Sequence, residues 1–564
     1  MPTPQEARAA LLASGRFALA DEPFHDGSIK VYANAPASMR EILLDSRRYG
    51  ERVFTVYEDE TTTFDQFFQR TAALARRMTE AGIVKGDRVA VGMRNYPEWP
   101  VAFFACQAIG AIVVALNAWW TTAELEFALE DSEPAGLLID GERLERLAPL
   151  LQAHPPKFLA VARRGGAGPG GFDFDEAMSG EGPLPDVEVG PHDLSTILYT
   201  SGTTGRPKGA MHAHRNHITN LMNGQLGGAV MRAVAGVPNP DQPPPVEGSA
   251  QAGALQTFPF FHIAGVSGIY SAVANGSKLA LMYKWVPAEG VRLVETHKLS
   301  SAAGVPMVMR QLLEHARESG ADLSSLAGVA AGGAPVPPDL IKRIGDQFQS
   351  RASAGNGYGL TETTSAVISN GGPEYFAHPD SIGRPGTTAQ IRIVGEDGQD
   401  VAQGDIGELW VRGPNVIPGY WRNPEATEAA FGGGWFRTGD LGYVDEAGLH
   451  YVVDRAKDVI LRGGENVYSA EVEAAILPLP GVKDVAVLGL PHDIYGEEVA
   501  AVIQMRPEAI TPGAEARIAQ ALEADMARFK IPTRIILTAD ELLRTGTGKL
   551  LKRELKSLYF PVAR

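Results

Sequence analysis

Cysteine is almost absent from this sequence, since Cys106 is the only one among 564 residues. A framework of disulfide bonds is therefore excluded, and the composition fits a reducing compartment. Cys106 follows the apolar stretch 103–105, so we interpret it as a small buried hydrophobic residue rather than a nucleophile. We expect a cytoplasmic protein.

Long hydrophobic segments and an excess of basic residues are also missing. The longest apolar run, 101–116, is broken by Gln107 and Gly110 and is shorter than the roughly 20 residues that span a bilayer. We expect no membrane span, and no signal peptide, because the N-terminus lacks a basic start and an apolar core. The net charge of −16 argues against general nucleic-acid binding, and an anionic ligand must therefore meet local clusters of lysine and arginine.

The length and the hydrophobic pattern predict more than one domain. Helical and strand patterns alternate in the first part of the chain, as where Thr63 and Gln66 form a capping box before an amphipathic helix. Such alternation predicts an α/β fold with a largely parallel sheet. After about residue 375, short β-like runs predict a small β-rich subdomain. We expect an N-terminal domain at 1–454 and a compact C-terminal domain at 455–564.

The most informative stretch is Tyr199-Thr200-Ser201-Gly202-Thr203-Thr204-Gly205-Arg206-Pro207-Lys208-Gly209. A short apolar strand leads into a loop whose glycines let backbone N–H groups approach an anion, while its hydroxyls and Lys208 add donors and charge. The Walker A motif requires Ser or Thr after the lysine, but Gly209 follows here, which excludes a P-loop NTPase. The loop therefore fits a polyphosphate, and a solvated surface loop is the alternative.

Six later stretches, in order along the chain, support one relationship. They are Gly332-Gly333-Ala334-Pro335, Tyr358-Gly359-Leu360-Thr361-Glu362, Trp435-Phe436-Arg437-Thr438-Gly439-Asp440, Asp454-Arg455-Ala456-Lys457-Asp458, Gly463-Gly464-Glu465-Asn466 and Arg544-Thr545-Gly546-Thr547-Gly548-Lys549. Together with the loop at 199–209 they resemble the adenylate-forming superfamily, which contains acyl-CoA synthetases, luciferases and nonribosomal adenylation domains. One departure is Leu543, which stands where a proline usually precedes Arg544, so the loop lacks that rigid φ angle.

The resemblance implies a large N-terminal domain of α/β layers with a small β-barrel-like subdomain, and a small, mobile α+β C-terminal domain. It also implies an AMP-forming acid–thiol ligase that uses ATP, Mg²⁺ and coenzyme A and forms an acyl-AMP intermediate. The implied partners are small molecules only, and a homodimer is compatible with the sequence.

The same resemblance assigns the catalytic roles. Thr361 contacts the α-phosphate, and Glu362 holds Mg²⁺, which neutralises developing negative charge. Lys549 bridges the substrate carboxylate and the α-phosphate, and His262 lies beside the acyl carbonyl. Lys457 occupies the hinge position about which the C-terminal domain turns between the two steps.

Other residues are implied to bind the nucleotide and coenzyme A. Tyr358 stacks near the adenine, Asp440 accepts both ribose hydroxyls, and Arg455 contacts ribose and phosphate. Gly463 and Gly464 line the pantetheine channel. The full set of implied contacts is Thr200, Ser201, Gly202, Thr203, Thr204, Gly205, Lys208, Gly333, Ala334, Pro335, Tyr358, Asp440, Arg455, Gly463 and Gly464.

The stretch 258–265 resembles the segment that shapes the acyl pocket, with Val266, Gly268 and Ile269 as further lining. Amino-acid-activating relatives carry an aspartate after the phenylalanine, whereas His262 stands here, and burying an ammonium without a partner is costly. A hydrophobic acid is therefore favoured, with a medium- or long-chain fatty acid as the main prediction. The alternatives are an aryl-CoA ligase acting on a benzoate- or cinnamate-like acid, a ligase that passes the acyl group to a carrier protein or to oxygen, and an inactive binding protein.

Three histidines, His212, His214 and His217, follow the glycine-rich loop. No cysteine and few carboxylates lie nearby, so a transition-metal site is disfavoured. We expect these histidines at the surface or at the start of a helix.

Overall fold

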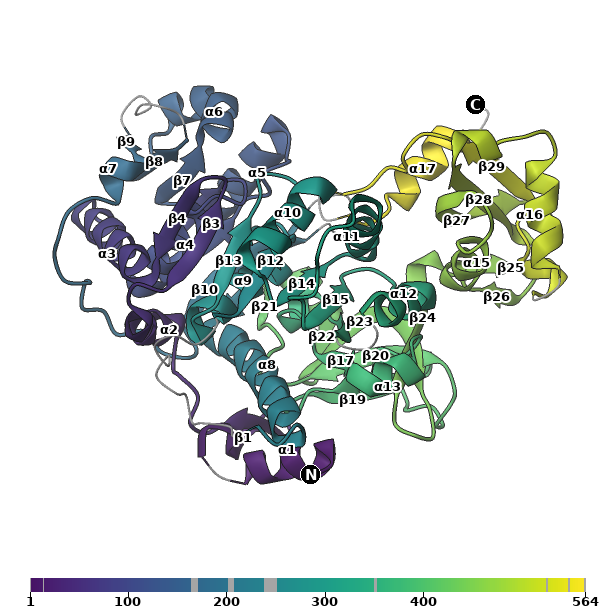
Figure 1. The fold of residues 1–564 in the computed structure, drawn as a ribbon, viewed down its shortest axis with the longest axis horizontal. Helices are drawn as coiled ribbons and strands as arrows, with labels where there is room; N and C mark the ends of the chain where they lie inside the picture. The colour runs from purple at the N-terminus through teal and green to yellow at the C-terminus, as the bar shows by residue number, and fades with distance from the viewer. Residues whose placement is uncertain are drawn as a thin grey trace.

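Two large β-sheets organise the N-terminal part of the molecule (Figure 1). The computed structural model describes residues 2–13, 15–163, 171–200, 207–237, 251–348, 352–523, 526–545 and 548–561. Within these residues the first sheet has eight strands, of which β11 alone runs against the others, because it pairs antiparallel with both β10 and β21 while the remaining pairs are parallel. In order across the sheet they are β21 (Gly419–Tyr420), β11 (Lys208–Ala213), β10 (Leu194–Thr200), β6 (Ile112–Ala115), β5 (Arg88–Gly92), β7 (Gly136–Asp140), β8 (Phe158–Ala162) and β9 (Phe172–Asp173).

The second sheet has nine described strands, and the six in its interior, from β16 to β3, are parallel. In order they are β18 (Arg384–Pro385), β17 (Ile368–Gly371), β16 (Ser353–Tyr358), β15 (Gly328–Gly332), β14 (Ser301–Gly304), β12 (Gly253–Gln256), β13 (Lys278–Leu281), β3 (Val53–Tyr57) and β4 (Glu60–Thr63). Parallel sheets need cover on both faces, because their strands are apolar on both sides.

Four helices join the two sheets into one core. They are α3 (Phe64–Glu80), α4 (Glu98–Ala108), α8 (His214–Val234) and α9 (Ile263–Asn275), and the largest buried cluster combines their side chains with residues of both sheets. The capping box of Thr63 and Gln66 at the start of α3 is present as predicted. Every residue of α4 is buried, and Cys106 is fully buried within it, also as predicted.

The remaining helices cover the outer faces. Residues of α5 and α6 pack on the first sheet, and residues of α10, α11 and α12 pack on the second. A β-hairpin, β1 (Leu19–Phe24) and β2 (Gly27–Tyr32), lies near the N-terminus. The other helices of this part are α1 (Pro4–Leu12), α2 (Met39–Ser46), α5 (Thr122–Ser132), α6 (Gly141–Ala153), α7 (Phe174–Ala177), α10 (Pro287–His297), α11 (Pro306–Ser319), α12 (Pro338–Phe348), α13 (Gly372–Ala377) and α14 (Pro424–Ala430).

A third, antiparallel sheet forms the β-rich subdomain that the sequence predicts. Its strands are β19 (Gln390–Val394), β20 (Gly407–Arg412), β23 (Trp435–Val444), β22 (Phe431–Gly432) and β24 (His450–Arg455). The last strand leads into the short 3-10 turn η4 (Ala456–Asp458), after which the chain enters the C-terminal unit.

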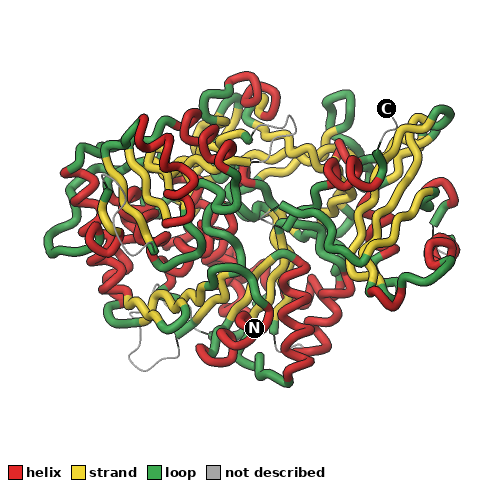
Figure 2. Tube along the Cα trace, turned by 90° about the horizontal axis from the view of Figure 1, so that it is seen from above, coloured by secondary structure: helices red, strands yellow, loops and turns green. Residues whose placement is uncertain are grey.

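The C-terminal unit stays to the right of the other sheets in both views (Figure 1 and Figure 2). Its elements are β25 (Ile460–Arg462), β26 (Glu465–Val467), α15 (Ser469–Ile476), β27 (Val482–His492), β28 (Gly496–Met505), α16 (Ala514–Leu522), β29 (Arg534–Thr538) and α17 (Lys552–Tyr559). The segment before α17, drawn in yellow, reaches back toward α11 (Figure 1). Residues near Lys549 can therefore meet the N-terminal part.

These elements agree with the predicted fold class, which combines large α/β layers, a small β subdomain and a small α+β unit. The domain boundary at 454/455 stays a prediction. Among the described residues, none of the helices combines the length and the apolar character that crossing a lipid bilayer requires.

Candidate active site

Strands β10 and β11 carry the glycine-rich loop. They pair antiparallel from Leu194↔Ala213 to Thr200↔Lys208, so the two ends of the loop lie side by side. The predicted contacts Ser201, Gly202, Thr203, Thr204 and Gly205 lie outside the described residues. The ammonium nitrogen of Lys208 lies 5.2 Å from the ring centre of Tyr420, which belongs to the adjacent strand β21.

Tyr358, Asp440 and Arg455 form one hydrogen-bonded cluster. Tyr358 Oη donates to Oδ2 of Asp440 at 2.7 Å, and Arg455 Nε lies 2.8 Å from Oδ1 of the same carboxylate. Asp440 has 3% of its surface exposed, and this burial raises its pKa, while the Arg455 charge opposes that change. The structure thus brings together three residues that were predicted to surround the adenosine.

Thr361 and Glu362 lie in the 3-10 turn η3 (Thr361–Thr363), shortly after β16. The buried Glu362 carboxylate accepts a hydrogen bond from Tyr420 Oη at 2.8 Å. His212 Nε2 lies 2.9 Å from the Thr361 carbonyl oxygen and donates to it. Mg²⁺ is commonly held by one or two carboxylates together with substrate phosphates. The Glu362 carboxylate fits this role, because Tyr420 links it to β11, the strand that follows the phosphate loop.

The three histidines differ from the surface position that the sequence suggested. His212, His214 and His217 are all fully buried, although His214 does start helix α8. Burial lowers the pKa of His212 and of His214 to about 4, and that of His217 well below its ordinary value. The surface alternative was wrong, whereas a helix-start position is correct for His214. His214 Nδ1 accepts from the Met39 N–H at 3.1 Å, and the His217 ring packs against the rings of His212 and Tyr270. No group of three or more metal-binding side chains occurs among the described residues.

His262 caps helix α9, and its Nδ1 accepts a hydrogen bond from the Ala264 backbone at 3.2 Å. Its ring is nearly parallel to that of Phe258, with centroids 6.3 Å apart. Burial, together with the charge of nearby Lys549, lowers the pKa of His262 to about 3. The imidazole is therefore neutral at neutral pH, and it lies close to the predicted catalytic lysine.

The turn that follows β15 contacts the same region. Gly333 has a φ of +77°, and a Cβ at this residue would lie 3.8 Å from side-chain atoms of both Phe258 and Val305. Ala334 is partly buried and Pro335 is exposed. A Cβ at this position would make only ordinary van der Waals contacts, but the positive φ would strain any other residue, which favours glycine.

Lys549 lies in a hairpin-like loop that reaches the N-terminal part. A Cβ on Gly548 would lie 3.1 Å from Val305 Cγ2, so this loop touches the segment after β14. Lys549 is exposed when its whole surface is counted, but protein surrounds its ammonium end. The resulting desolvation lowers the pKa of the ammonium, and the charge of Arg455 also lowers it. The charges of Asp440 and Glu362 oppose this lowering. Four predicted residues therefore act on one another electrostatically.

The departure at Leu543 does not leave the lysine loop without support. The backbone N–H of Leu551 donates to the Leu543 carbonyl at 2.9 Å, and the Thr545 N–H donates to the Lys549 carbonyl at 2.8 Å. Arg544 donates to the Gly548 carbonyl at 2.5 Å and pairs with Asp484. These hydrogen bonds join the two sides of the loop, and they restrain the backbone near Leu543, where a proline would fix the φ angle.

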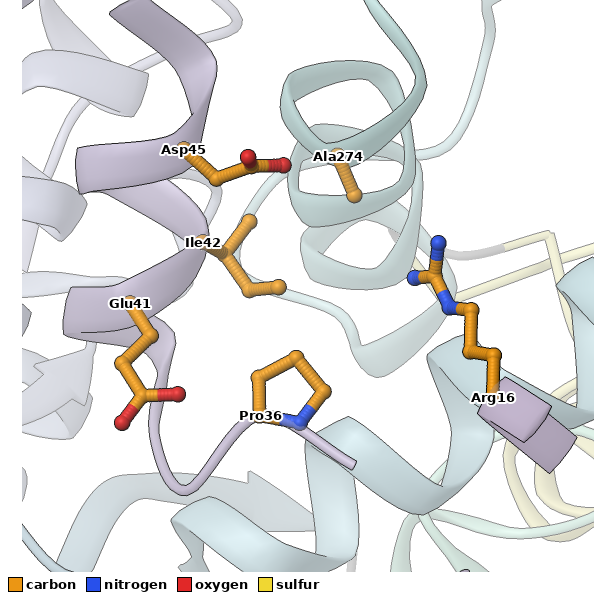
Figure 3. Close-up of a pocket in the computed structure, with 6 residues that line it drawn as sticks. All are labelled: Arg16, Pro36, Glu41, Ile42, Asp45 and Ala274. Carbon is orange, nitrogen blue, oxygen red and sulfur yellow. The ribbon is translucent and has the colours of Figure 1, made fainter. Parts of the chain in front are cut away.

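A separate cavity of about 320 Å³ lies between α2, the end of α9 and the N-terminal segment (Figure 3). It is lined by Arg16, Pro36, Glu41, Ile42, Asp45 and Ala274. None of these is a predicted site residue.

Comparison with known proteins decides the family. A family model for AMP-binding enzymes matches residues 44–421, and one for the AMP-binding enzyme C-terminal domain matches residues 471–549. The chain belongs to the AMP-binding enzyme family.

Relatives of this AMP-binding enzyme include a feruloyl-CoA synthase from Amycolatopsis sp, which is 34% identical over 495 residues, covering 88% of this chain and 93% of that protein. An o-succinylbenzoate CoA synthetase from Bacillus subtilis, solved with the acyl-adenylate intermediate OSB-AMP, has a TM-score of 0.76 at 28% identity and covers 93% of this chain and 98% of that one. The same enzyme solved with ATP and a magnesium ion has a TM-score of 0.76 at 29% identity, covering 91% and 99%.

These relationships confirm the predicted family, its fold and its enzyme class, an AMP-forming acid–thiol ligase that uses ATP, Mg²⁺ and coenzyme A. The roles of individual residues in this AMP-binding enzyme stay predictions.

In this AMP-binding enzyme the lysine loop and the glycine turn of the C-terminal unit have different surroundings. The charges of Arg455, Asp440 and Glu362 act on the pKa of Lys549. The turn at Gly463 and Gly464 instead contacts Tyr495 of its own unit, with the Gly463 N–H donating to the Tyr495 carbonyl at 2.8 Å. Lys457 lies between the two units, in η4. The structure therefore has the lysine loop, and not the glycine turn, near the nucleotide cluster.

Sequence reasoning missed the residues that hold the acyl-side segment. Asn95 donates to the Phe258 carbonyl at 3.0 Å and accepts from the Phe260 N–H at 2.9 Å. Gln256 donates to the same carbonyl at 2.7 Å. The Asn95-Tyr96-Pro97 turn after β5 offered a local turn signal, but its partner lies 163 residues away.

Proposed function

We propose that this AMP-binding enzyme is an aryl-CoA ligase, which joins an aromatic carboxylic acid to AMP and then transfers the acyl group to coenzyme A. The observation that carries the adenylation step is the contact of the Lys549 loop with the N-terminal part at Val305, together with the effects of Asp440 and Glu362 on the pKa of Lys549 and of Lys549 on the pKa values of Asp440 and His262. This arrangement can hold a carboxylate and a phosphate at one point.

In the first step, a carboxylate oxygen of the acid forms a bond to the α-phosphorus of ATP, and the bond to pyrophosphate breaks. Lys549 stabilises the charge that builds up on both groups, and Thr361 orients the α-phosphate. Asp440 accepts the ribose hydroxyls, while Arg455 neutralises that buried acid. When Mg²⁺ is bound at Glu362, it supplies charge neutralisation for the phosphates.

In the second step, the C-terminal domain (455–564) turns about Lys457 relative to the N-terminal domain (1–454). The turn withdraws Lys549 and brings Gly463 and Gly464 to the acyl adenylate. The coenzyme A thiol gives its proton to solvent, its sulfur bonds to the acyl carbon, and the bond from that carbon to the phosphate oxygen of AMP breaks. Two poses are needed because each step requires different groups around the same carbonyl carbon.

An aromatic acid is favoured over a long aliphatic chain by the packing beside α9. Val266 and Ile269, which were predicted to line the pocket, are fully buried in the core. The Gln256 amide oxygen lies 2.5 Å from where a Cβ of Gly268 would be, so the space next to this glycine is already filled. The Phe258 and His262 rings offer flat surfaces, and aromatic rings stack on such surfaces. Relatives that act on feruloyl and succinylbenzoate groups add support.

A panel of acids tests this proposal. Pyrophosphate release would be measured with benzoate, cinnamate, ferulate, octanoate, hexadecanoate and phenylalanine, and AMP release would then be compared with and without coenzyme A. We expect kcat/KM for the best aromatic acid to exceed that for the best aliphatic acid by about tenfold or more. A preference for hexadecanoate would restore the fatty-acid prediction, and AMP release that does not depend on coenzyme A would exclude it as the acceptor.

Cytoplasmic location and a homodimer complete the proposal. Cell fractionation and light scattering of the purified enzyme would test them.

A further inference from the structure

Strand β11 presents three side chains on one face. Residues at alternate positions of a strand lie on the same side, which groups Lys208, Ala210 and His212. Strand β21 pairs antiparallel with β11, with Tyr420 opposite Ala210, and the Trp421 N–H donates to the Gly209 carbonyl at 2.7 Å. The strand that leaves the phosphate loop therefore has Tyr420 fixed beside it.

Tyr420 connects this strand to the Glu362 carboxylate. Its hydroxyl donates to Glu362 Oε1 at 2.8 Å, and the Lys208 ammonium nitrogen lies over its ring, 5.2 Å from the ring centre. Tyr420 is buried, with 6% of its surface exposed. A buried hydroxyl that donates to a buried carboxylate restrains its orientation, because a carboxylate oxygen accepts hydrogen bonds preferentially near its lone-pair directions.

His212 makes a second connection, to the backbone of the same turn. Since a carbonyl can only accept, His212 carries its proton on Nε2 and donates it to Thr361. The ring is held from behind by His217, with centroids 5.1 Å apart, and His217 Nε2 contacts the Thr196 hydroxyl of β10 at 3.0 Å.

The far side of the turn is held by the segment 414–417. The Ile417 N–H donates to the Glu362 carbonyl at 3.0 Å, and Asn415 Nδ2 donates to the Thr363 carbonyl at 2.9 Å. The turn is thus fixed between this segment and β11. Among the described residues, Tyr420 is the one that donates a hydrogen bond to the Glu362 carboxylate.

We propose that Tyr420 and His212 are positioning residues that set the orientation of the Glu362 carboxylate and of Thr361 relative to the strand after the phosphate loop. Neither touches the reacting atoms. These two residues keep the strand after the phosphate loop and the turn that contains Thr361 and Glu362 in a constant position relative to each other. This inference rests on the proposed adenylation chemistry, and it adds two residues to which the sequence analysis gave no role in that chemistry.

The alternative is that both side chains only pack the core. Tyr420→Phe distinguishes a positioning role from a packing role, because it keeps the ring and its contact with Lys208 and removes only the hydroxyl. Tyr451→Phe is the matched control, since Tyr451 Oη donates to Asp445 at 3.1 Å in a different part of the molecule. For the histidine, His212→Gln keeps an N–H donor and His212→Leu removes it.

ATP binding would be measured by calorimetry without acid, in the presence and absence of MgCl₂, together with the melting temperature. We expect Tyr420→Phe to reduce the gain in ATP affinity that Mg²⁺ gives by about tenfold, the scale of one hydrogen bond to a charged group, with Mg²⁺-free affinity unchanged. The melting temperature should fall as well, because the variant leaves the buried Glu362 carboxylate without this donor. Tyr451→Phe should leave that gain intact. An undiminished gain in Tyr420→Phe, or an equal loss with and without Mg²⁺, would overturn the proposal for Tyr420.

The rate of acid-dependent pyrophosphate release tests the histidine. His212→Leu should lower kcat with little change in KM for the acid, and His212→Gln should restore most of it. If both variants lose the same activity, or if both lose it only through a lower melting temperature, His212 has a packing role alone. Because the calorimetric test needs no acid, it still reports on Tyr420 if the proposed acid class is wrong.

Discussion

Asp440 and Arg455 face each other across β23 and β24, with Arg455 Nε 2.8 Å from Asp440 Oδ1. Arg455 is the last residue of β24, directly before the turn that contains Lys457. The acid predicted to hold the ribose is therefore paired with the residue at which the chain leaves the N-terminal part. The predicted nucleotide site and the start of the C-terminal unit therefore lie next to each other at this pair.

Asp440→Asn should weaken ATP binding without loss of stability. Burial raises the pKa of Asp440 despite its partners, so the folded protein disfavours the charged form, and a neutral amide of the same shape removes that cost. We expect the affinity for ATP to fall by about tenfold or more, since hydrogen bonds to a charged group are lost, while the melting temperature stays the same or rises. Calorimetry and thermal unfolding would measure both.

Asp445→Asn provides the opposite case. Its carboxylate accepts from the Leu449 N–H and from Tyr451, and these hydrogen bonds lower the pKa of Asp445 against a desolvation that raises it. This variant should lower the melting temperature and leave ATP affinity unchanged. A destabilised Asp440→Asn with normal ATP affinity would contradict the role given to Asp440.

Lys549→Ala should suppress adenylation by about 10²–10³-fold, the usual loss when one charge-stabilising group is removed. Thioester formation from supplied acyl adenylate should be spared, because the proposed rotation of the C-terminal domain withdraws the lysine in that step. Pyrophosphate release and acyl-CoA formation would be followed separately, with the exposed Lys483→Ala as a control. Equal losses in both half-reactions would show that Lys549 does not act in adenylation alone.

Lys457→Pro should act on the second half-reaction. A fixed φ at this position of η4 hinders rotation of the C-terminal unit but leaves the present pose, with Lys549 near Asp440, accessible. Pyrophosphate exchange should continue, and acyl-CoA formation should fall at least about tenfold, as expected for a hinge. Lys457→Ala, which keeps φ free, should retain both rates. A parallel fall of both rates in the proline variant would place the hinge elsewhere.

Acid should destabilise the fold through its buried histidines. Burial lowers the pKa of His212 and His214 to about 4 and of His262 to about 3, whereas an unfolded histidine titrates near 6.5. Below about pH 6.5 the unfolded chain therefore binds more protons than the native one, and the free energy of unfolding falls as the pH decreases toward 4. Above pH 6.5 these groups add no pH dependence.

The slope is measurable by urea unfolding between pH 7 and 5. Each such histidine contributes up to about 1.4 kcal/mol per pH unit, so His214→Gln should flatten the curve by up to that amount. The exposed His154→Gln should leave the slope unchanged. An identical slope in His214→Gln and the native enzyme would refute the assignment of His214.

Local patterns predicted local structure well. The capping box of Thr63 and Gln66 begins α3, and the apolar stretch around Cys106 forms a buried helix, because both depend on contacts within a few residues. The motifs also indicated the family, since glycines and hydroxyls near a phosphate are required at particular positions whatever the surrounding packing.

What the sequence by itself determined was therefore the list of chemical groups and the elements that carry them. Only the tertiary structure decided which groups meet. Tyr358 and Asp440 are 82 residues apart, His212 and Thr361 are 149 apart, and none of the three histidines after the loop is exposed. The physical reason is that burial and partner choice depend on which strand covers β11 and on where the C-terminal unit docks, and these contacts join segments distant in the chain.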